Sequence, residues 1–323
     1  MGHQATPLNP AAMVTWIRGE GLHRQAKEWA REHVKRLEEV GITPKLAIIL
    51  LNDDPVELAT QRRFASLKAR DVREVGGEAE IYELHDVPPE RRTKEALRLI
   101  ESLNKRDDVT GVIIQKPVPP FVDERALFAA LSPEKDVDAL TPDNKKRLLD
   151  RFDLDNDVLP CTPAGILELF RMYGIEIRGK DVVVVGKGEL VGKPLSVMLM
   201  QLDATVTVLH ALSKEREPYV KRADIVISAV GRPPEIYRDN PWRLTGEMIK
   251  EGVVVVGVGG KVDPISGKWH FDVDEKSVAE KASYLTPNIG GVGLATRARV
   301  LKNLIRTSYQ VARLVVSSRI VGP

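Results

Sequence analysis

The chain has only one cysteine among its 323 residues, Cys161, so it cannot form an intramolecular disulfide. It has no apolar run long enough to cross a bilayer. Its 48 Lys and Arg residues are balanced by 46 Asp and Glu, and a net charge of +2 creates no field that would attract nucleic acid or an anionic membrane. These absences favour a small-molecule partner, with no nucleic acid and no membrane.

The N-terminus also lacks the basic and apolar segments of a secretory signal, because Met1 to Gln4 are followed by neither. Together with the lone cysteine, this predicts a cytoplasmic location. We expect no metal site.

The length suits two domains of ordinary size. In the first part of the chain, amphipathic helices are expected to alternate with short apolar strands. The helices are expected over residues 21–40, 56–76 and 90–104, and the strands over 45–51, 81–84 and 111–115. Such alternation predicts a parallel sheet covered on both faces.

A second series of elements begins near Cys161 and predicts a Rossmann-type, doubly wound parallel sheet. A helix is expected over 163–173, and strands over 181–185, 204–209, 224–228 and 253–256. The polar stretch 150–157 is the expected linker, and a last helix, about 295–317, is expected to return to the first domain. The predicted α/β domains are therefore 1–157 plus 294–323, and 158–293.

A glycine-rich turn follows the strand 181–185 and precedes a helix, which is the context that a phosphate-binding turn requires. Its candidate coenzyme residues are Gly186, Lys187, Gly188, Val191 and Gly192. The spacing is also compatible with a purely structural strand-to-helix turn.

The next strand ends in His210, where NAD-binding domains often have a carboxylate that would repel a 2′-phosphate. Lys187 can add positive charge in the turn. We therefore expect NADP, with NAD as the alternative. Val230, Gly231 and Gly257, near the ends of later strands, complete the candidate coenzyme site.

Seven segments occur in a recognisable order: LAIILLNDDP, GVIIQKPVPP, PEKDVDALTPDN, LPCTPAGILELF, VVVVGKGELVGKPLS, ATVTVLH and SYLTPNIGGVG. Over nearly the whole chain they resemble the bifunctional methylenetetrahydrofolate dehydrogenase/cyclohydrolase family. The resemblance implies oxidation of 5,10-methylene-tetrahydrofolate with NADP and hydrolysis of the methenyl product to the 10-formyl form. It also implies a homodimer formed through the second domain.

The family usually carries a Tyr-x-x-x-Lys pair, with the lysine nine residues beyond the proline of the DDP loop, where this chain has Phe64. If about one helical turn, four residues, was added near the loop, the pair falls back into register. Lys68 then resembles the catalytic lysine, as a surface-accessible residue of the site, and Phe64 replaces the tyrosine. The alternative is that Lys68 is one of many exposed lysines on an amphipathic helix.

The resemblance assigns two further polar residues. Gln115 resembles the glutamine that hydrogen-bonds the catalytic lysine, and Asp138 resembles the carboxylate that holds the pterin ring. Judged from the residues alone, Asp136 and Asp138 are also compatible with a helix cap and a loop acid. The pterin site is completed by Pro117, Gly290 and Gly291, which stand in the resembling segments.

Departures from the family pattern keep other functions open. Leu294 replaces a proline on the pterin side, and Ala211 replaces a serine on the coenzyme side. The alternatives are a dehydrogenase without hydrolase activity, an enzyme of a methanopterin carrier, and a non-catalytic folate- or nucleotide-binding regulator. An amino-acid or shikimate-type dehydrogenase would share the two-domain plan but gives no reason for IIQKPVP and KDVD.

Overall fold

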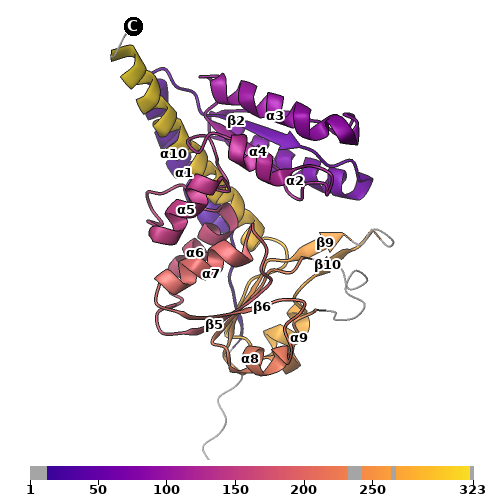
Figure 1. The fold of residues 1–323 in the computed structure, drawn as a ribbon. Coiled ribbons are helices and arrows are strands. Elements are labelled where there is room, and N and C mark those ends of the chain that lie inside the picture. Colours follow the sequence, from indigo (N-terminus) through magenta and orange to yellow (C-terminus); the bar gives the residue numbers. More distant parts are fainter. Residues whose placement is uncertain (1–12, 232–241, 263–266, 321–323) are drawn as a thin grey trace, which may run out of the picture.

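The structure is a computed structural model that describes residues 13–231, 242–262 and 267–320. Figure 1 shows two lobes, with a long C-terminal helix extending along them. Residues 1–4, for which the sequence predicts no secretory signal, lie outside the described ranges. Within those ranges, no helix combines the length and the apolar character needed to span a membrane.

The first lobe is a three-stranded parallel sheet in the order β3-β2-β4, with helices on both faces. Its elements are β2 (Lys45–Leu50), α2 (Pro55–Glu74), β3 (Glu78–Glu83), α3 (Pro89–Lys105), β4 (Gly111–Ile114), α4 (Glu124–Ala130) and α5 (Pro142–Asp150), preceded by α1 (Glu20–Glu38). Successive residues of a strand point to opposite faces. Accordingly, Leu46 and Ile48 pack with α1 and α2, whereas Ala47 and Ile49 pack with α3 and α4.

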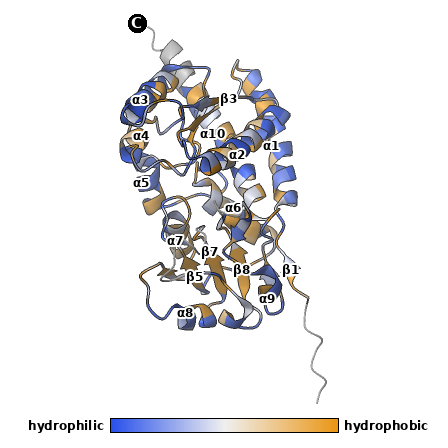
Figure 2. Ribbon diagram, turned by 90° about the vertical axis from the view of Figure 1, so that its right-hand side faces the viewer, coloured by the Kyte–Doolittle hydropathy of each residue, from blue (hydrophilic) through white to orange (hydrophobic). Residues whose placement is uncertain are grey.

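The second lobe is a six-stranded sheet in the order β1-β11-β8-β7-β5-β6, in which all neighbours are parallel. Its strands are β5 (Asp181–Val185), β6 (Thr205–Leu209), β7 (Ile225–Ser228), β8 (Val254–Gly257), β11 (Tyr284–Leu285) and, from before α1, β1 (Thr15–Trp16). Its helices are α6 (Cys161–Met172), α7 (Gly192–Gln201), α8 (Arg216–Arg222), η2 (Gly246–Met248) and α9 (Glu275–Ala279). Figure 2 shows β5, β7 and β8 as apolar and the outer α8 as largely polar, as expected for a buried parallel sheet.

An antiparallel hairpin of β9 (Gly260–Val262) and β10 (Trp269–Phe271) follows β8. The sequence patterns do not predict it. In Figure 1 it extends from the second lobe toward α2 of the first.

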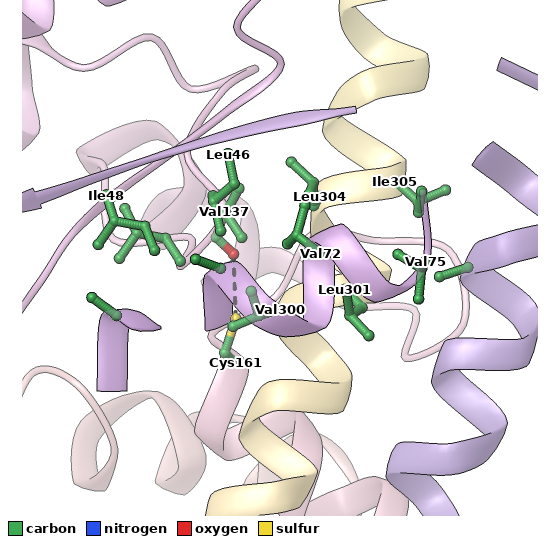
Figure 3. Packing of buried hydrophobic residues seen from close by; sticks show 14 of the residues in the cluster. Leu46, Ile48, Val72, Val75, Val137, Cys161, Val300, Leu301, Leu304 and Ile305 are labelled. Carbon is green, nitrogen blue, oxygen red and sulfur yellow. Dashed lines mark hydrogen bonds between the residues drawn. The ribbon is translucent and has the colours of Figure 1, made fainter. Parts of the chain in front are cut away.

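The last helix, α10 (Val292–Ile320), joins the two lobes, because it packs against α6, α1 and α2. Figure 3 shows Val300, Leu301 and Leu304 of α10 in the same apolar cluster as Val72 of α2 and Leu46 of β2. The predicted two-domain α/β fold and the return of the last helix are therefore confirmed.

Candidate active site

Helix α2 is continuous through the stretch where the sequence suggests an added turn. Asp54 caps its N-terminus, since the carboxylate accepts hydrogen bonds from the N–H groups of Val56 and Glu57 at 3.1 and 2.9 Å. Residues four apart on an unbroken helix share a face, so Phe64 and Lys68 do. The helix therefore has the geometry that is required if one turn was added between the DDP loop and Lys68; this is the shifted alignment of the chain with the family pattern.

Lys68 lies buried where α2 meets the end of β4. Only 8% of the residue is exposed, and its Nζ donates a hydrogen bond to Oε1 of Gln115 at 2.8 Å. Gln115 is held in turn, because its N–H donates to the carbonyl of Ile49 at 2.9 Å. The alternative of an exposed lysine is wrong, and so is the expectation of a surface-accessible one, because α2 packs this side chain against the sheet.

Phe64 and Pro117 are both exposed, Phe64 to 39%. The carbonyl of Pro117 accepts a hydrogen bond from Nε2 of Gln61 at 2.7 Å. Gln61 is 1% exposed, and its Oε1 has no hydrogen-bond partner among the described residues. The sequence reasoning missed Gln61, although its position two helical turns before Lys68 was an available signal.

The two acids of the KDVD segment have different environments. Asp136 is buried, and its carboxylate accepts hydrogen bonds from the N–H of Thr141 at 2.7 Å and from Nδ2 of Asn144 at 2.9 Å. Burial raises the pKa of Asp136 above its usual value, although these hydrogen bonds act in the opposite direction. Asp138 is only half-buried. Asp136 therefore orders the turn that carries Asp138.

Cys161 lies beside Asp138 at the start of α6, and its thiol donates to the carbonyl of Val137 at 3.4 Å (Figure 3). Burial, followed by the charge of Asp138 and a hydrogen bond to it, raises the pKa of the Cys161 thiol well above its usual value; the charge of Lys68 opposes this. A thiol in this state is not a nucleophile. Asp138 and Lys68 therefore both act on Cys161, and Lys68 is in turn bound to Gln115.

Gly290 and Gly291 lie just before α10 and contact the start of α1. Gly290 has a φ of +88°, and its carbonyl accepts a hydrogen bond from the N–H of Gly19 at 2.8 Å. A Cβ on Gly291 would lie 2.7 Å from the carbonyl oxygen of Pro287. Both positions therefore require glycine for close packing. Their contact with substrate stays a prediction.

The glycines of the turn between β5 and α7 differ in what surrounds them. A Cβ on Gly186, where φ is +112°, would lie 2.4 Å from the carbonyl oxygen of Ala229, and one on Gly192 would lie 1.9 Å from that of Gly186. In the described part of the chain, a Cβ on Gly188 would meet no atom within 4 Å other than those of its chain neighbours. Gly186 and Gly192 are thus needed for the turn itself, whereas Gly188 and the exposed Lys187 border open space at the N-terminus of α7.

The predicted coenzyme residues gather at one edge of the six-stranded sheet. Gly186, His210 and Gly257 stand at the C-terminal ends of β5, β6 and β8, and Val230 and Gly231 follow β7 closely. The next strand in the chain, β6, pairs with one edge of β5, and the strand after it, β7, pairs with the other edge. Open parallel sheets bind their ligands outside such a reversal of strand order.

Asp272, which the sequence reasoning missed, organises this edge. Its buried carboxylate accepts hydrogen bonds from the N–H groups of Val230 at 2.7 Å and Gly231 at 3.0 Å, and from the hydroxyl of Ser228 at 3.1 Å. Burial raises the pKa of Asp272, against the effect of these hydrogen bonds. The two N–H groups are therefore engaged within the protein, and a coenzyme contact at this loop has to use other atoms.

The loop after β6 folds back on His210. Nδ1 of His210 accepts a hydrogen bond from the backbone N–H of Leu212 at 3.2 Å, and the backbone N–H of His210 donates to the hydroxyl of Ser213 at 2.9 Å. A hollow of about 950 Å³ adjoins this loop; its lining includes the cations Lys214, Arg216 and Arg243 and the anions Glu215 and Glu217.

The coenzyme turn contacts the first lobe as well as the second. Val191 packs against the apolar core around α7, but its neighbour Leu190 packs against the first lobe, in the cluster between the sheet and α3 and α4. Glu189 pairs with Nζ of Lys145 at 3.5 Å. The two halves of the candidate site are thus in direct contact.

Asp71, one turn after Lys68, ties α2 to α1 and α10. It is 1% exposed, and its carboxylate is bound by Nε and Nη2 of Arg297, both at 2.6 Å, and by His23 and Lys27, both at 2.9 Å. Burial alone would raise its pKa, but the hydrogen bonds from His23, Arg297 and Lys27 hold the pKa of Asp71 well below its usual value.

Asp71→Asn is expected to lower the free energy of unfolding by about 3 kcal/mol, because Arg297 and Lys27 lose their counter-charge. A lowered folded pKa means that this stabilisation is present above about pH 4, the pKa of an unfolded carboxyl, and is lost as the pH falls toward the folded value. Denaturation between pH 7 and pH 3 should therefore show an acid loss of stability that is smaller in the variant. Glu83→Gln, which breaks the exposed pair with Arg62, is the control; an equal loss in both variants would contradict the role of Asp71.

Two family models match the chain in sequence order. One, described as "Tetrahydrofolate dehydrogenase/cyclohydrolase, catalytic domain", matches residues 17–138. The other, described as "Tetrahydrofolate dehydrogenase/cyclohydrolase, NAD(P)-binding domain", matches residues 160–312. The chain belongs to the tetrahydrofolate dehydrogenase/cyclohydrolase family. The first match contains Lys68 and Gln115, and the second contains the glycine turn.

Named members of the tetrahydrofolate dehydrogenase/cyclohydrolase family are similar over almost the whole chain. "Bifunctional protein FolD" of Pyrobaculum aerophilum is 86% identical over 308 residues, which cover 95% of this chain and 99% of the relative. The crystal structure of the bifunctional FolD methylenetetrahydrofolate dehydrogenase/cyclohydrolase from Campylobacter jejuni has a TM-score of 0.81 at 34% identity, and covers 92% of this chain and 99% of that one. The Trypanosoma brucei dehydrogenase-cyclohydrolase, complexed with NADP and an inhibitor, has a TM-score of 0.81 at 31% identity, with 93% and 99% covered.

These similarities confirm the family predicted from the sequence, a bifunctional dehydrogenase and cyclohydrolase with an NAD(P)-binding domain. The roles of individual site residues in this chain are a separate matter, because they depend on its own geometry.

Proposed function

We propose that this family member oxidises 5,10-methylene-tetrahydrofolate to the 5,10-methenyl form with NADP, and hydrolyses the methenyl form to 10-formyl-tetrahydrofolate. The observation that carries the residue assignment is the buried pair of Lys68 and Gln115, joined at 2.8 Å. A buried structural lysine is normally satisfied by several acceptors, as Lys135 is by the carbonyls of residues 103, 104 and 106. Within the described ranges, the amine of Lys68 is held by one neutral amide, that of Gln115, which supports an active role.

We assign three roles within the first domain. Lys68 takes a proton from the water that attacks the methenyl carbon, and Gln115 orients its amine through the hydrogen bond. Asp138 accepts two parallel hydrogen bonds from the pterin ring, whose nitrogen and amino group match the two carboxylate oxygens. Phe64 supplies an exposed aromatic face for stacking.

The residues of the second domain fit a dinucleotide coenzyme. The open space that a Cβ on Gly188 would enter lies at the N-terminus of α7, where phosphates bind. When bound, the coenzyme accepts a hydride from the carbon between the two substrate nitrogens. The side chains of this domain position and hold it.

The preference for NADP rests on the end of β6. That strand ends in His210 instead of a carboxylate, and the adjoining hollow has Lys214, Arg216 and Arg243 in its lining. Arg243 is already paired with Asp274 at 3.2 Å, so the preference for a 2′-phosphate rests on the absence of a carboxylate at the end of β6 and on Lys214 and Arg216 in the adjoining lining.

The hydrolase half of the proposal is tested with methenyl-tetrahydrofolate alone, without coenzyme, by the decay of methenyl absorbance. We expect the protein to accelerate this decay over buffer. If the decay is not accelerated but hydride transfer is active, the protein is a dehydrogenase without hydrolase activity. The replacement of the family tyrosine by Phe64 would then explain the missing activity.

We further propose a homodimer formed through the second domain, as the family resemblance implies, and a cytoplasmic location, which the lone Cys161 favours. The proposed domains are 1–157 plus 294–323, and 158–293, with β1 as an N-terminal extension that pairs with the second sheet. A solution mass of about twice 35.9 kDa by light scattering would support the dimer, and the mass of one chain would contradict it.

A further inference from the structure

The hairpin of β9 and β10 is linked to helix α2 of the other domain by an ion pair. Nζ of Lys261 lies 2.6 Å from Oε1 of Glu57, and the two side chains are 33% and 17% exposed. Lys261 is the central residue of β9, and Glu57 lies in the first turn of α2. This pair therefore connects the coenzyme domain to the helix that carries Lys68.

The base of the same hairpin is fixed to the coenzyme loop. Asp272 directly follows β10, and its carboxylate receives the N–H groups of Val230 and Gly231. Its own N–H donates to the carbonyl of Gly259 at 3.0 Å, and the N–H of Gly259 donates to the carbonyl of Ser228 at 3.1 Å. A Cβ on Gly259 would lie 1.9 Å from Oδ2 of Asp272, so the close packing at this base requires glycine.

The contacts form one continuous path between the two halves of the site. The path leads from the loop after β7, through Asp272, to the hairpin, and then through Lys261 and Glu57 to α2. Glu57 and Lys68 are eleven residues apart on this helix, close to three full turns and about 16 Å along its axis. An unbroken helix transmits a displacement of its first turn to Lys68.

We propose that the hairpin is a strap between the domains, and that the Glu57–Lys261 ion pair makes coenzyme binding and folate binding support each other. Coenzyme bound beside Val230 and Gly231 stabilises the position of Asp272 and of the hairpin base, and the Glu57–Lys261 ion pair then holds α2 in place at the pterin site. By linkage, folate that orders α2 favours coenzyme to the same degree. The proposal rests on the function proposed above, because it requires that both ligands bind.

The coupling is measured as the ratio of two dissociation constants for NADP, without and with saturating 5-formyl-tetrahydrofolate, a reduced folate that lacks the reactive one-carbon bridge. We expect the wild type to bind NADP about fivefold more tightly with the folate present. Glu57→Gln and Lys261→Gln should each bring the ratio close to one, because each leaves half of the pair. High salt should reduce the wild-type ratio and leave that of the variants unchanged.

Two further variants give the test its controls. The reversed pair, Glu57→Lys with Lys261→Glu, should recover most of the ratio, since the attraction is restored with its signs exchanged. Glu83→Gln removes an ion pair to Arg62 of the same helix, but within one domain, and should keep the wild-type ratio.

The inference is overturned if either single variant keeps the wild-type ratio, or if the wild type, while binding both ligands, shows a ratio of one. A wild type that binds neither ligand would overturn the proposed function instead. Reversed and single variants with equally low ratios would show that the residues matter for reasons other than their pairing, and the strap would be rejected.

Discussion

Lys68→Met is expected to slow the hydrolysis of methenyl-tetrahydrofolate by a factor of about 10²–10⁴, the range found when a positioned general acid–base group is removed. Methionine keeps a long unbranched side chain in the buried space and removes the amine. The fold should tolerate the change, because the hydrogen bond described for this amine is the one to Gln115. Steady-state hydrolysis without coenzyme is the measurement.

Its matched control is Lys146→Met, since Lys146 is exposed on α5. That variant should hydrolyse like the wild type, and both variants should bind NADP with unchanged affinity. Wild-type hydrolysis in Lys68→Met, with a normal melting temperature, would contradict the shifted alignment that assigns this lysine to the site.

The second large effect is expected at the glycine turn. Gly188→Val should weaken NADP binding by about tenfold to hundredfold, because a branched side chain would enter the space where the pyrophosphate approaches the N-terminus of α7. Apart from Gly188 and its two chain neighbours, no atom of the described residues lies within 4 Å of the added Cβ, so the free energy of unfolding should change by less than about 1 kcal/mol. Titration calorimetry and thermal unfolding measure the two quantities.

Gly192→Ala, in the same turn, should behave in the opposite way. Its Cβ would lie 1.9 Å from the carbonyl oxygen of Gly186, so the turn has to shift and the protein should be destabilised even without coenzyme. An unaltered dissociation constant in Gly188→Val would mean that the turn only connects β5 to α7.

The parts of this structure that repeat a simple period were predictable from the sequence. The strands β2, β4 and β5 are short apolar runs, and α1, α2 and α3 have apolar residues at helical spacing, so their places in two parallel sheets follow from pattern. The candidate site could be predicted for a related reason. Counting nine residues from the proline of the DDP loop leads to Phe64. If one helical turn was added before this point, the helical period keeps the same face, and the lysine is Lys68, which contacts Gln115.

Other features depend on contacts between distant segments and have no local pattern. The two residues of β1 are too few to show a period, although they extend the sheet of the other domain. Asp71 and Arg297 are separated by 226 residues, and Asp272 lies 41 residues from Gly231. An acid in a polar segment looks like a solvated one until the fold buries it.

The most direct test of the proposed function is to incubate the protein with 5,10-methylene-tetrahydrofolate and either NADP or NAD, while the absorbance of the methenyl form and that of reduced nicotinamide are followed together. We expect reduced NADP to form without accumulation of the methenyl compound, and at a higher rate than reduced NAD. No reduced nicotinamide with either coenzyme would contradict the proposed activity of this chain.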